Sequence, residues 1–438
     1  MQLKKIKGQM AAATCALLQV ATSATNAAEN DWDVNTAFLY YGEGDGRVQA
    51  AEPAIYMGRN IGDDDRIDLR VVVDALTGAT PNGAYAIKGV AQTFTTPSGN
   101  SDYTIAPGDA PLDSTFKDTR VALGADYTQS LDRMSKIIWG ANLSGEHDYF
   151  SMGVSANYSQ DFNNRNTTLN VGLGFNSDSI NAHSGTPTEF APMMVSGTGK
   201  NVSGDSESKT LTDFMIGITQ VIDRKTMVQL NLSLGSVSGY QNDPYKIVTV
   251  VADPATGLPI TGVDSPFFDT AVTGNRPYVY EKRPDSRQKN SLFLKAVHHL
   301  DEDVINASYR YYSDDWGIKS HTLDLKYRYE LANSYLQPHV RYYSQSAADF
   351  YRHNLVLNTD INIAGNVLVD YASHDYRLAE STTTTLGLKY GIPMSDNSEF
   401  SVRGELITQT VNDGAVPAGQ ETPDLSAIML QVNYSFVW

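Results

Sequence analysis

The last eleven residues constrain the fold of this chain more than any other stretch. They read IMLQVNYSFVW, and apolar side chains occupy every second position: Ile428, Leu430, Val432, Tyr434, Phe436 and Trp438. Successive side chains of a β-strand point to opposite faces, so this period of two predicts a strand with one continuous apolar face. Such a face has to be covered by lipid or by a protein core. An edge strand of a secreted β-sandwich would show the same pattern, so the rest of the chain has to distinguish a lipid-covered strand from a strand of a sandwich.

The same alternation recurs along the whole chain, whereas helical periodicity nowhere lasts longer than one turn. Apolar residues alternate with polar ones in the stretches 32–40, 67–73, 121–127, 137–143, 150–158, 169–175, 214–218, 228–234, 292–294, 305–311, 323–329, 336–342, 386–392 and 402–406. Residues 47–59 fit the pattern least well, and we place a further strand there. The chain is therefore predicted to be an all-β protein.

The connections between these strands alternate in length. Seven are tight and rich in Asp, Asn and Ser, which favour turns: 62–65, 130–133, 161–166, 222–225, 300–303, 331–334 and 395–398. Several of the others are long, at 78–116, 177–208, 238–288 and 346–374. Short turns on one side and long loops on the other are typical of a transmembrane antiparallel β-barrel, with the periplasm on the short side and the loops outside the cell. If both termini lie on the same side as the seven tight turns, the chain makes eight hairpins, which predicts sixteen strands.

An alternative count of eighteen strands depends on residues 346–392. Residues 354–363 and 367–371 also alternate, and 364–366 could form a turn between them. Sixteen is preferred because residues 375–392 read as one long uninterrupted strand, which would leave 354–371 as a hairpin within an outer loop.

The first 28 residues have the pattern of a secretion signal. Three lysines near the start precede a short apolar run from Met10 to Val20, and small residues follow from Ala21 to Ala28. Residues 29–438 would then form the barrel and its loops. The only cysteine, Cys15, lies in the signal segment, so we expect no disulfide and no thiolate chemistry in the mature chain.

Composition favours a barrel over a sandwich. Only 41% of the residues are hydrophobic. This is typical of a barrel, because apolar lipid-facing residues alternate with polar lumen-facing residues and their hydropathies cancel in any average. Tyrosines stand on the apolar face of several strands, as membrane interfaces favour, and these are Tyr309, Tyr311, Tyr327, Tyr329, Tyr342, Tyr390 and Tyr434. The formal net charge of −17 argues against a nucleic-acid partner. We therefore expect a protein of the outer membrane of a Gram-negative bacterium, surrounded by lipid and lipopolysaccharide.

Several blocks resemble a family of proteobacterial outer-membrane proteins of unknown function. They read LRVVVDALTGATPNGA (69–84), PLDSTFKDTRVAL (111–123), DPYKIV (243–248), RPDSR (283–287), YRYYSDDWGIKSHT (309–322) and VRYYSQSAADFY (340–351). The resemblance implies an outer-membrane barrel and no established activity. It also implies periplasmic partner proteins in a redox or metal-handling context. The final strand resembles the closing strands that the barrel-assembly machinery reads, with Tyr434, Phe436 and Trp438 as the assembly signal.

Strand parity predicts which polar residues face the lumen. The candidates for a lumen constriction are Arg70, Asp74, Lys295, Arg310, Lys326, Arg328, His339, Arg341, Lys389, Arg403 and Glu405, with Asp68, Arg120, Asp126, Asp213, Asp324 and Glu330 on the same face. One interpretation is that these residues form cross-strand ion pairs that stiffen the wall. The other is a predominantly basic constriction that passes or binds anions.

The loops offer fewer candidates. Asp314 and Asp315 in the turn at 313–316 could bind Ca²⁺, although two adjacent aspartates supply few of the six or more ligands required. Asp and Arg residues of the 243–246 and 283–287 blocks could instead pair and fold the longest loop into the barrel mouth. His298 and His299 point to opposite faces of a strand, and His183, His321, His353 and His374 are scattered near the outer rim, so no enzyme and no cofactor are expected.

Two functions follow from these patterns. The first is a porin-like channel or transporter for small solutes, with anions favoured. The second is a loop-plugged barrel that serves as a scaffold or export partner for periplasmic proteins.

Overall fold

The barrel wall contains sixteen antiparallel strands. In this computed structural model, the described residues are 31–44, 47–62, 64–78, 81–112, 117–395 and 397–438. In order around the closed wall, the strands are β1 (Trp32–Glu43), β2 (Gln49–Ile61), β3 (Asp65–Thr77), β6 (Lys117–Asp132), β7 (Ser135–Gly145), β8 (Tyr149–Phe162), β9 (Thr167–Ile180), β13 (Glu207–Val221), β14 (Thr226–Gly239), β17 (Ser286–His299), β18 (Val304–Asp314), β19 (Lys319–Leu331), β20 (Ser334–Gln345), β22 (Glu380–Ser395), β23 (Ser398–Asn412) and β24 (Leu425–Val437). This confirms the predicted fold class and the count of sixteen. The predicted signal peptide (1–28) lies outside the described residues.

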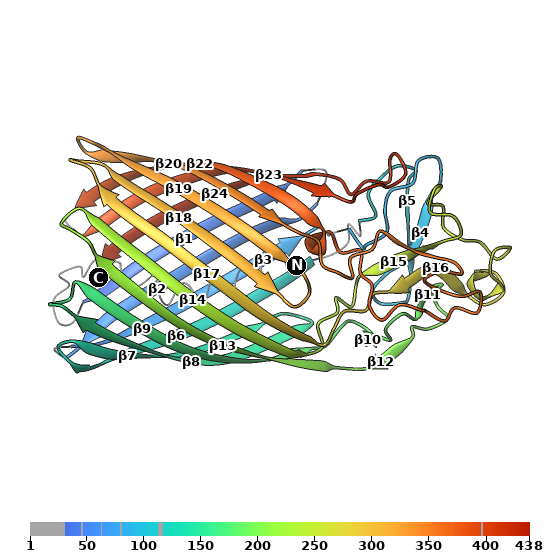
Figure 1. Ribbon diagram of the computed structural model, residues 1–438, viewed down its shortest axis with the longest axis horizontal. Helices are drawn as coiled ribbons and strands as arrows, with labels where there is room; N and C mark the ends of the chain where they lie inside the picture. Colours follow the sequence, from blue (N-terminus) through green and yellow to red (C-terminus); the bar gives the residue numbers. More distant parts are fainter. Residues whose placement is uncertain (1–30, 45–46, 63, 79–80, 113–116, 396) are drawn as a thin grey trace.

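The final strand closes the barrel. β24 pairs with β23 on one side and with β1 on the other, where Tyr434 lies opposite Thr36. Beyond the ladder, the backbone amides of Trp32 and Trp438 each donate to the other residue's carbonyl oxygen, at 2.7 and 2.8 Å. The wall therefore begins and ends at the same end of the barrel, where all seven predicted tight turns also lie (Figure 1).

An apolar band surrounds the outside of the wall. In β19, for example, Leu323, Leu325 and Tyr329 are about half exposed, while Asp324, Lys326 and Arg328 alternate with them on the inner face. Exposed apolar side chains recur on every wall strand except β18, where the outward side chains are partly exposed. In a transmembrane barrel, lipid covers such a surface. In the described part of the chain, no helix has the length and apolar character needed to cross a membrane.

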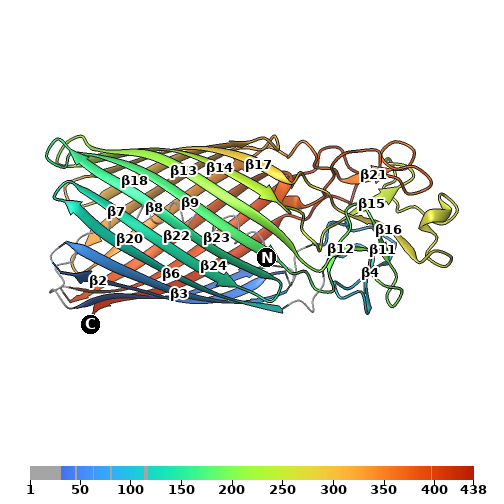
Figure 2. The same ribbon diagram turned by 90° about the horizontal axis from the view of Figure 1, so that it is seen from below.

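The long loops fold into a cap at the other end of the barrel (Figures 1 and 2). A four-stranded sheet in the order β11 (Pro192–Met194), β16 (Asn275–Tyr280), β15 (Ile247–Val251) and β21 (Asn354–Val356) joins segments of three different loops. The remaining short elements are β4 (Gln92–Thr95) with β5 (Asp102–Ile105), β10 (Thr186–Pro187) with β12 (Val202–Gly204), and two 3₁₀ turns, η2 (Pro266–Phe268) and η3 (Tyr376–Leu378). Val248, Val250, Phe268, Val279 and Leu355 form a buried core under this sheet. The cap thus has a hydrophobic core of its own.

Two predictions within residues 346–392 were wrong. Residues 354–371 do not form a two-stranded hairpin: β21 pairs in parallel with β15, and only one isolated antiparallel bridge joins Ile361 to Val367 around the predicted turn. Residues 375–379 do not extend β22, because the side chain of Asp375 accepts a hydrogen bond from the amide of Arg377 and starts η3. In both stretches, the alternating apolar residues, such as Leu355 and Leu378, pack into the cap rather than against lipid.

Candidate functional site

Most of the predicted inward charges are paired along the barrel wall. The ion pairs include Arg120 with Asp74 (Nε to Oδ2, 2.7 Å), Arg70 with Asp126 (4.0 Å), Lys326 with Asp324 (3.6 Å), Lys389 with Glu399 (3.2 Å), Arg403 with Glu405 (3.8 Å), and Arg328 with Glu330. Asp68 pairs with Arg66 at 2.9 Å. Each of these contacts neutralises charge locally, but only Arg120–Asp74, Arg70–Asp126 and Lys389–Glu399 join neighbouring strands, whereas the other pairs lie within one strand.

His339 connects three strands of the wall. Its Nε2 lies 2.8 Å from Asp324 on β19, and its Nδ1 lies 3.0 Å from Glu405 on β23. A neutral imidazole carries only one N–H group, so both hydrogen bonds can form at once only with an imidazolium. The geometry therefore favours a positively charged His339 held between two carboxylates.

Three predicted lumen cations differ from the rest. Among the residues that the structure describes, Lys295, Arg310 and Arg341 form no ion pair with a carboxylate. The guanidinium of Arg310 lies over the ring of Phe293, at 5.4 Å from its centroid. These residues lie on β17, β18 and β20, so a group of positive charges without a directly paired carboxylate lies in one sector of the wall, where Asp324 on β19 interacts at longer range with Lys295 and Arg341.

Large side chains near the tight-turn end lie flat against the wall. Tyr335 is only 1% exposed because its ring covers Gly391 on β22, where a Cβ atom would come within 2.2 Å of the ring. The Arg328 guanidinium stacks on this ring at 3.7 Å, and the Tyr335 hydroxyl donates to Glu399 at 2.6 Å. Sixteen strands enclose enough width for an aqueous channel unless loops or side chains fill the lumen.

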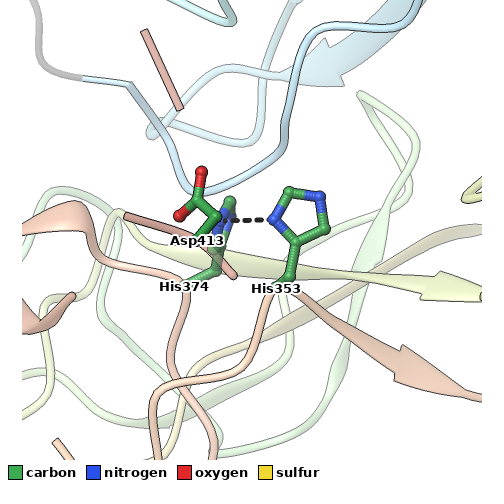
Figure 3. A group of neighbouring side chains, drawn as sticks. All are labelled: His353, His374 and Asp413. Carbon is green, nitrogen blue, oxygen red and sulfur yellow. Dashed lines mark hydrogen bonds between the residues drawn. The ribbon is translucent and has the colours of Figure 1, made fainter. Parts of the chain in front are cut away.

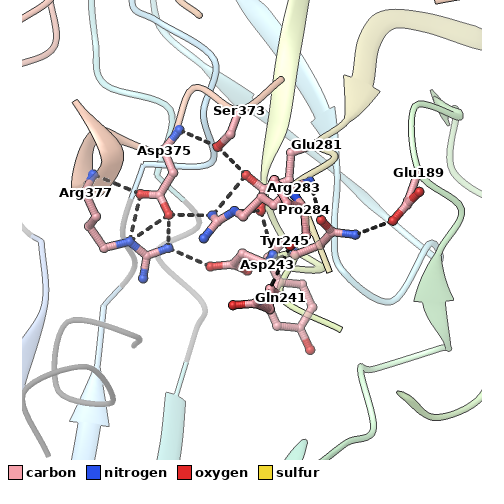
Figure 4. A network of polar contacts seen from close by, with 11 residues as sticks. Glu189, Gln241, Asp243, Tyr245, Glu281, Arg283, Pro284, Ser373, Asp375 and Arg377 are labelled. Carbon is pink, nitrogen blue, oxygen red and sulfur yellow. Dashed lines mark hydrogen bonds and ion pairs between the residues drawn. The ribbon is translucent and has the colours of Figure 1, made fainter. Parts of the chain in front are cut away.

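A buried network of charges holds the cap together over the barrel mouth (Figure 4). Arg377 pairs with Asp243 at 2.8 Å and with Asp375, and Arg283 pairs with Asp375 at 2.8 Å and with Glu281 at 2.7 Å. Burial alone would raise the pKa of Asp375, but the charges of Arg377 and its cationic neighbours outweigh it and hold this pKa well below its usual value. Asp243 and Arg283 of the two predicted blocks therefore form ion pairs with Arg377, Asp375 and Glu281 rather than with each other.

Further contacts join loops that start on opposite sides of the wall. The β3–β6 loop meets the β14–β17 loop where the Ile247 amide donates to Asn82 at 2.9 Å and the Tyr85 hydroxyl donates to Gly257 at 2.5 Å. The buried ammonium group of Lys246 donates to the carbonyl oxygen of Pro81. Since the two pairs of strands stand across the barrel from each other, these segments cross the mouth.

The two aspartates considered for Ca²⁺ are occupied by protein donors. Asp314 accepts from Arg287 at 2.8 Å, from the Tyr312 hydroxyl at 2.7 Å, and from the Trp316 and Ile318 amides at 3.1 and 3.0 Å. Asp315 accepts from the amide of Gln288 at 2.9 Å. Both carboxylates organise the β18–β19 turn.

Part of the cap network was not predicted from the sequence. Asp375 and Arg377 were not singled out, because residues 375–392 resembled one continuous barrel strand, and the two charges flank Tyr376 with the period of two that such a strand requires. Glu281, in the 238–288 loop, was not singled out either.

The chain matches one protein family over nearly its whole length. The match is to a protein family of unknown function, DUF3570, and spans residues 7–436. The chain belongs to this family. The sequence resemblance to an uncharacterised family of outer-membrane barrels is thereby confirmed, and no activity comes with it.

Other comparisons are distant. A search of curated proteins finds no significant match. Among solved structures, a bacterial polysaccharide outer membrane secretin is 8% identical with a TM-score of 0.42, covering 93% of this chain and 99% of its own. OccK5 (OpdH) of Pseudomonas aeruginosa is 9% identical with a TM-score of 0.42, covering 95% and 100%. The siderophore receptor PirA from Acinetobacter baumannii is 9% identical with a TM-score of 0.40, covering 87% and 53%. Similarities this distant carry no argument about function, which has to come from the chain's own residues.

Proposed function

We propose that this protein is an outer-membrane channel for small anionic solutes whose outer mouth is closed by its cap. The observation that carries the proposal is the group of three lumen cations, Lys295, Arg310 and Arg341, on a wall whose other predicted charges are largely neutralised. A cationic sector in a water-filled lumen raises the local concentration of anions and lowers that of cations.

The channel can open only when part of the cap moves away from the mouth. Loops from opposite sides of the wall cross the mouth, and their contacts include a hydrophobic core and a buried charge network. In this closed form a solute could not pass straight through the mouth, so transport requires part of the cap to move. Residues 245–280, which contain β15 and β16, form its centre.

Conductance of the purified protein in planar lipid bilayers tests the proposal. Deleting residues 245–280 should increase the conductance of a folded barrel, and under a salt gradient the reversal potential should indicate anion preference. Arg310→Glu and Arg341→Glu in this deletion background should shift the selectivity toward cations. Arg165→Glu is the matched control, because it makes the same charge change in an exposed tight turn and should leave the selectivity unchanged.

Closure of the mouth also favours a second candidate, the plugged scaffold or export partner for periplasmic proteins. A correctly folded barrel that stays silent after deletion of residues 245–280 would contradict the channel and support this alternative. Channels without anion preference, or with a preference that Arg310→Glu and Arg341→Glu do not change, would contradict the role given to the three cations.

A further inference from the structure

Three metal-ligating side chains meet in the cap, away from the lumen charges. His353 and His374 come from the β20–β22 loop and Asp413 comes from the β23–β24 loop, and one potential ligand atom of each lies within 4.8 Å of the other two (Figure 3). From the sequence, the two histidines were expected to lie near the outer rim without forming a common site. The structure brings them together because residues 354–371 fold into the cap between them.

His374 is oriented as a metal ligand would be. Its Nδ1 donates to the carbonyl oxygen of Gly83 at 2.6 Å, which fixes the proton on this nitrogen, so its Nε2 is left to accept a hydrogen bond from Nδ1 of His353 at 3.1 Å. A carbonyl acceptor for the second ring nitrogen is the usual support of a metal-bound histidine. Gly83 can present this carbonyl because its φ is +101° and its missing Cβ leaves room for the backbone oxygen of Ile247, which would lie 2.2 Å away.

His353 offers the second nitrogen. Its ring stacks on Tyr85 with centroids 4.2 Å apart, and its Nδ1 lies 3.1 Å from Nε2 of His374. Its Nε2 is buried with no hydrogen-bond partner among the described residues, so stacking, rather than a second hydrogen bond, holds the ring.

Asp413 supplies an oriented carboxylate. The Tyr351 hydroxyl donates to its Oδ1 at 2.6 Å, and the amide of Thr422 donates to its Oδ2 at 2.5 Å. Each oxygen keeps a lone pair for a further interaction.

The spacing fits a transition-metal ion. Two imidazole nitrogens bound to one zinc ion at about 2.0–2.1 Å in tetrahedral geometry stand about 3.3–3.4 Å apart. The two nitrogens lie 3.1 Å apart in a hydrogen bond, and the three ligand atoms lie within 4.8 Å of one another. A bound ion would replace this hydrogen bond, with the His353 proton moving to Nε2 and the Asp413 carboxylate completing the ligand set. Two neutral imidazoles and one carboxylate suit zinc, iron, cobalt or nickel and disfavour the all-oxygen cations Mg²⁺ and Ca²⁺.

We propose that His353, His374 and Asp413 bind one divalent transition-metal ion and leave at least one coordination position for water. The ion ties the β20–β22 loop to the β23–β24 loop, while Gly83 extends the site to the β3–β6 loop. The site is independent of the proposed channel and stands whether or not the barrel conducts.

Metal titration of the purified full chain in detergent tests the site. After treatment with EDTA, the protein should bind one Co²⁺ ion per chain with visible d–d absorption, Zn²⁺ should displace it, and equal concentrations of Mg²⁺ should not. His374→Ala and Asp413→Asn should each weaken Co²⁺ binding by about tenfold or more, since even the loss of an outer-shell partner costs about 10–100-fold. His183→Ala is the matched control, because His183 and His147 form another pair of rings in the outer loops, with centroids 5.8 Å apart.

Heat-modifiable mobility on gels first shows whether each variant forms a folded barrel. If His374→Ala does not fold, the Co²⁺ affinity of Asp413→Asn tests the proposal. Zn²⁺ should also slow proteolysis of the cap in the original chain and not in Asp413→Asn. Absence of stoichiometric Co²⁺ binding, displacement by Mg²⁺, or unchanged affinity in Asp413→Asn would each overturn the proposal.

Discussion

At the scale of single residues, burial decides which of the many charges matter. The Arg377 side chain is 6% exposed and pairs with Asp243 and Asp375, whereas Arg352 in the same cap is 41% exposed and pairs with Asp360 at 3.4 Å. Removing one partner of a buried pair leaves an uncompensated charge and costs about 3–5 kcal/mol. An exposed pair contributes less than about 1 kcal/mol.

We therefore expect Arg377→Met to loosen the cap and Arg352→Met to leave it nearly unchanged. The measurement is the rate of limited proteolysis within residues 240–285 of the folded protein, which should rise steeply in Arg377→Met alone. Equal rates in the two variants would show that the buried network does not hold the cap.

At the scale of elements, the period of two predicted every strand of the wall, including the weak stretch at 47–59, which is β2. The pattern fails where its apolar face is buried by protein. Leu355 and Leu378 alternate with polar residues as wall residues do, yet they pack inside the cap. Alternation reports that one face is covered and does not say whether lipid or a protein core covers it.

The most specific prediction for an element concerns β24, which pairs on both edges and ends at Val437, one residue before Trp438. Trp438→Ser, or deletion of residues 436–438, should lower the fraction of inserted barrel, because the closing strand loses its terminal aromatic residues and part of its pairing with β1. Trp139→Ser on β7 is the control, since this side chain is also exposed on the outside of the wall. The heat-modifiable fraction on gels measures the effect. If Trp438→Ser folds as well as Trp139→Ser, the assembly role of the last strand is wrong.

At the scale of the whole molecule, the sequence predicted the barrel and its asymmetry but could not predict how the cap is assembled. Strand pairing in the wall joins neighbours in the chain, and only the closure of β1 on β24 is distant. The cap contacts are distant throughout, as between Gly83 and His374 or Asp243 and Arg377, and no local pattern specifies such partners. Alternation within a strand predicts which side chains face the lumen, because it is a local pattern. It does not specify which of these side chains form ion pairs.

The central claim is that the barrel crosses the outer membrane with its cap outside and its tight turns in the periplasm. The mature chain is expected to contain no cysteine, so single-cysteine variants can report each side. Val263→Cys places the thiol on the cap, where Val263 is 93% exposed, and Arg224→Cys places it in the exposed β13–β14 turn. In intact cells, a membrane-impermeant maleimide should label Val263→Cys and not Arg224→Cys, and both should react after the cells are lysed. Labelling of Arg224→Cys but not Val263→Cys in intact cells would contradict this topology.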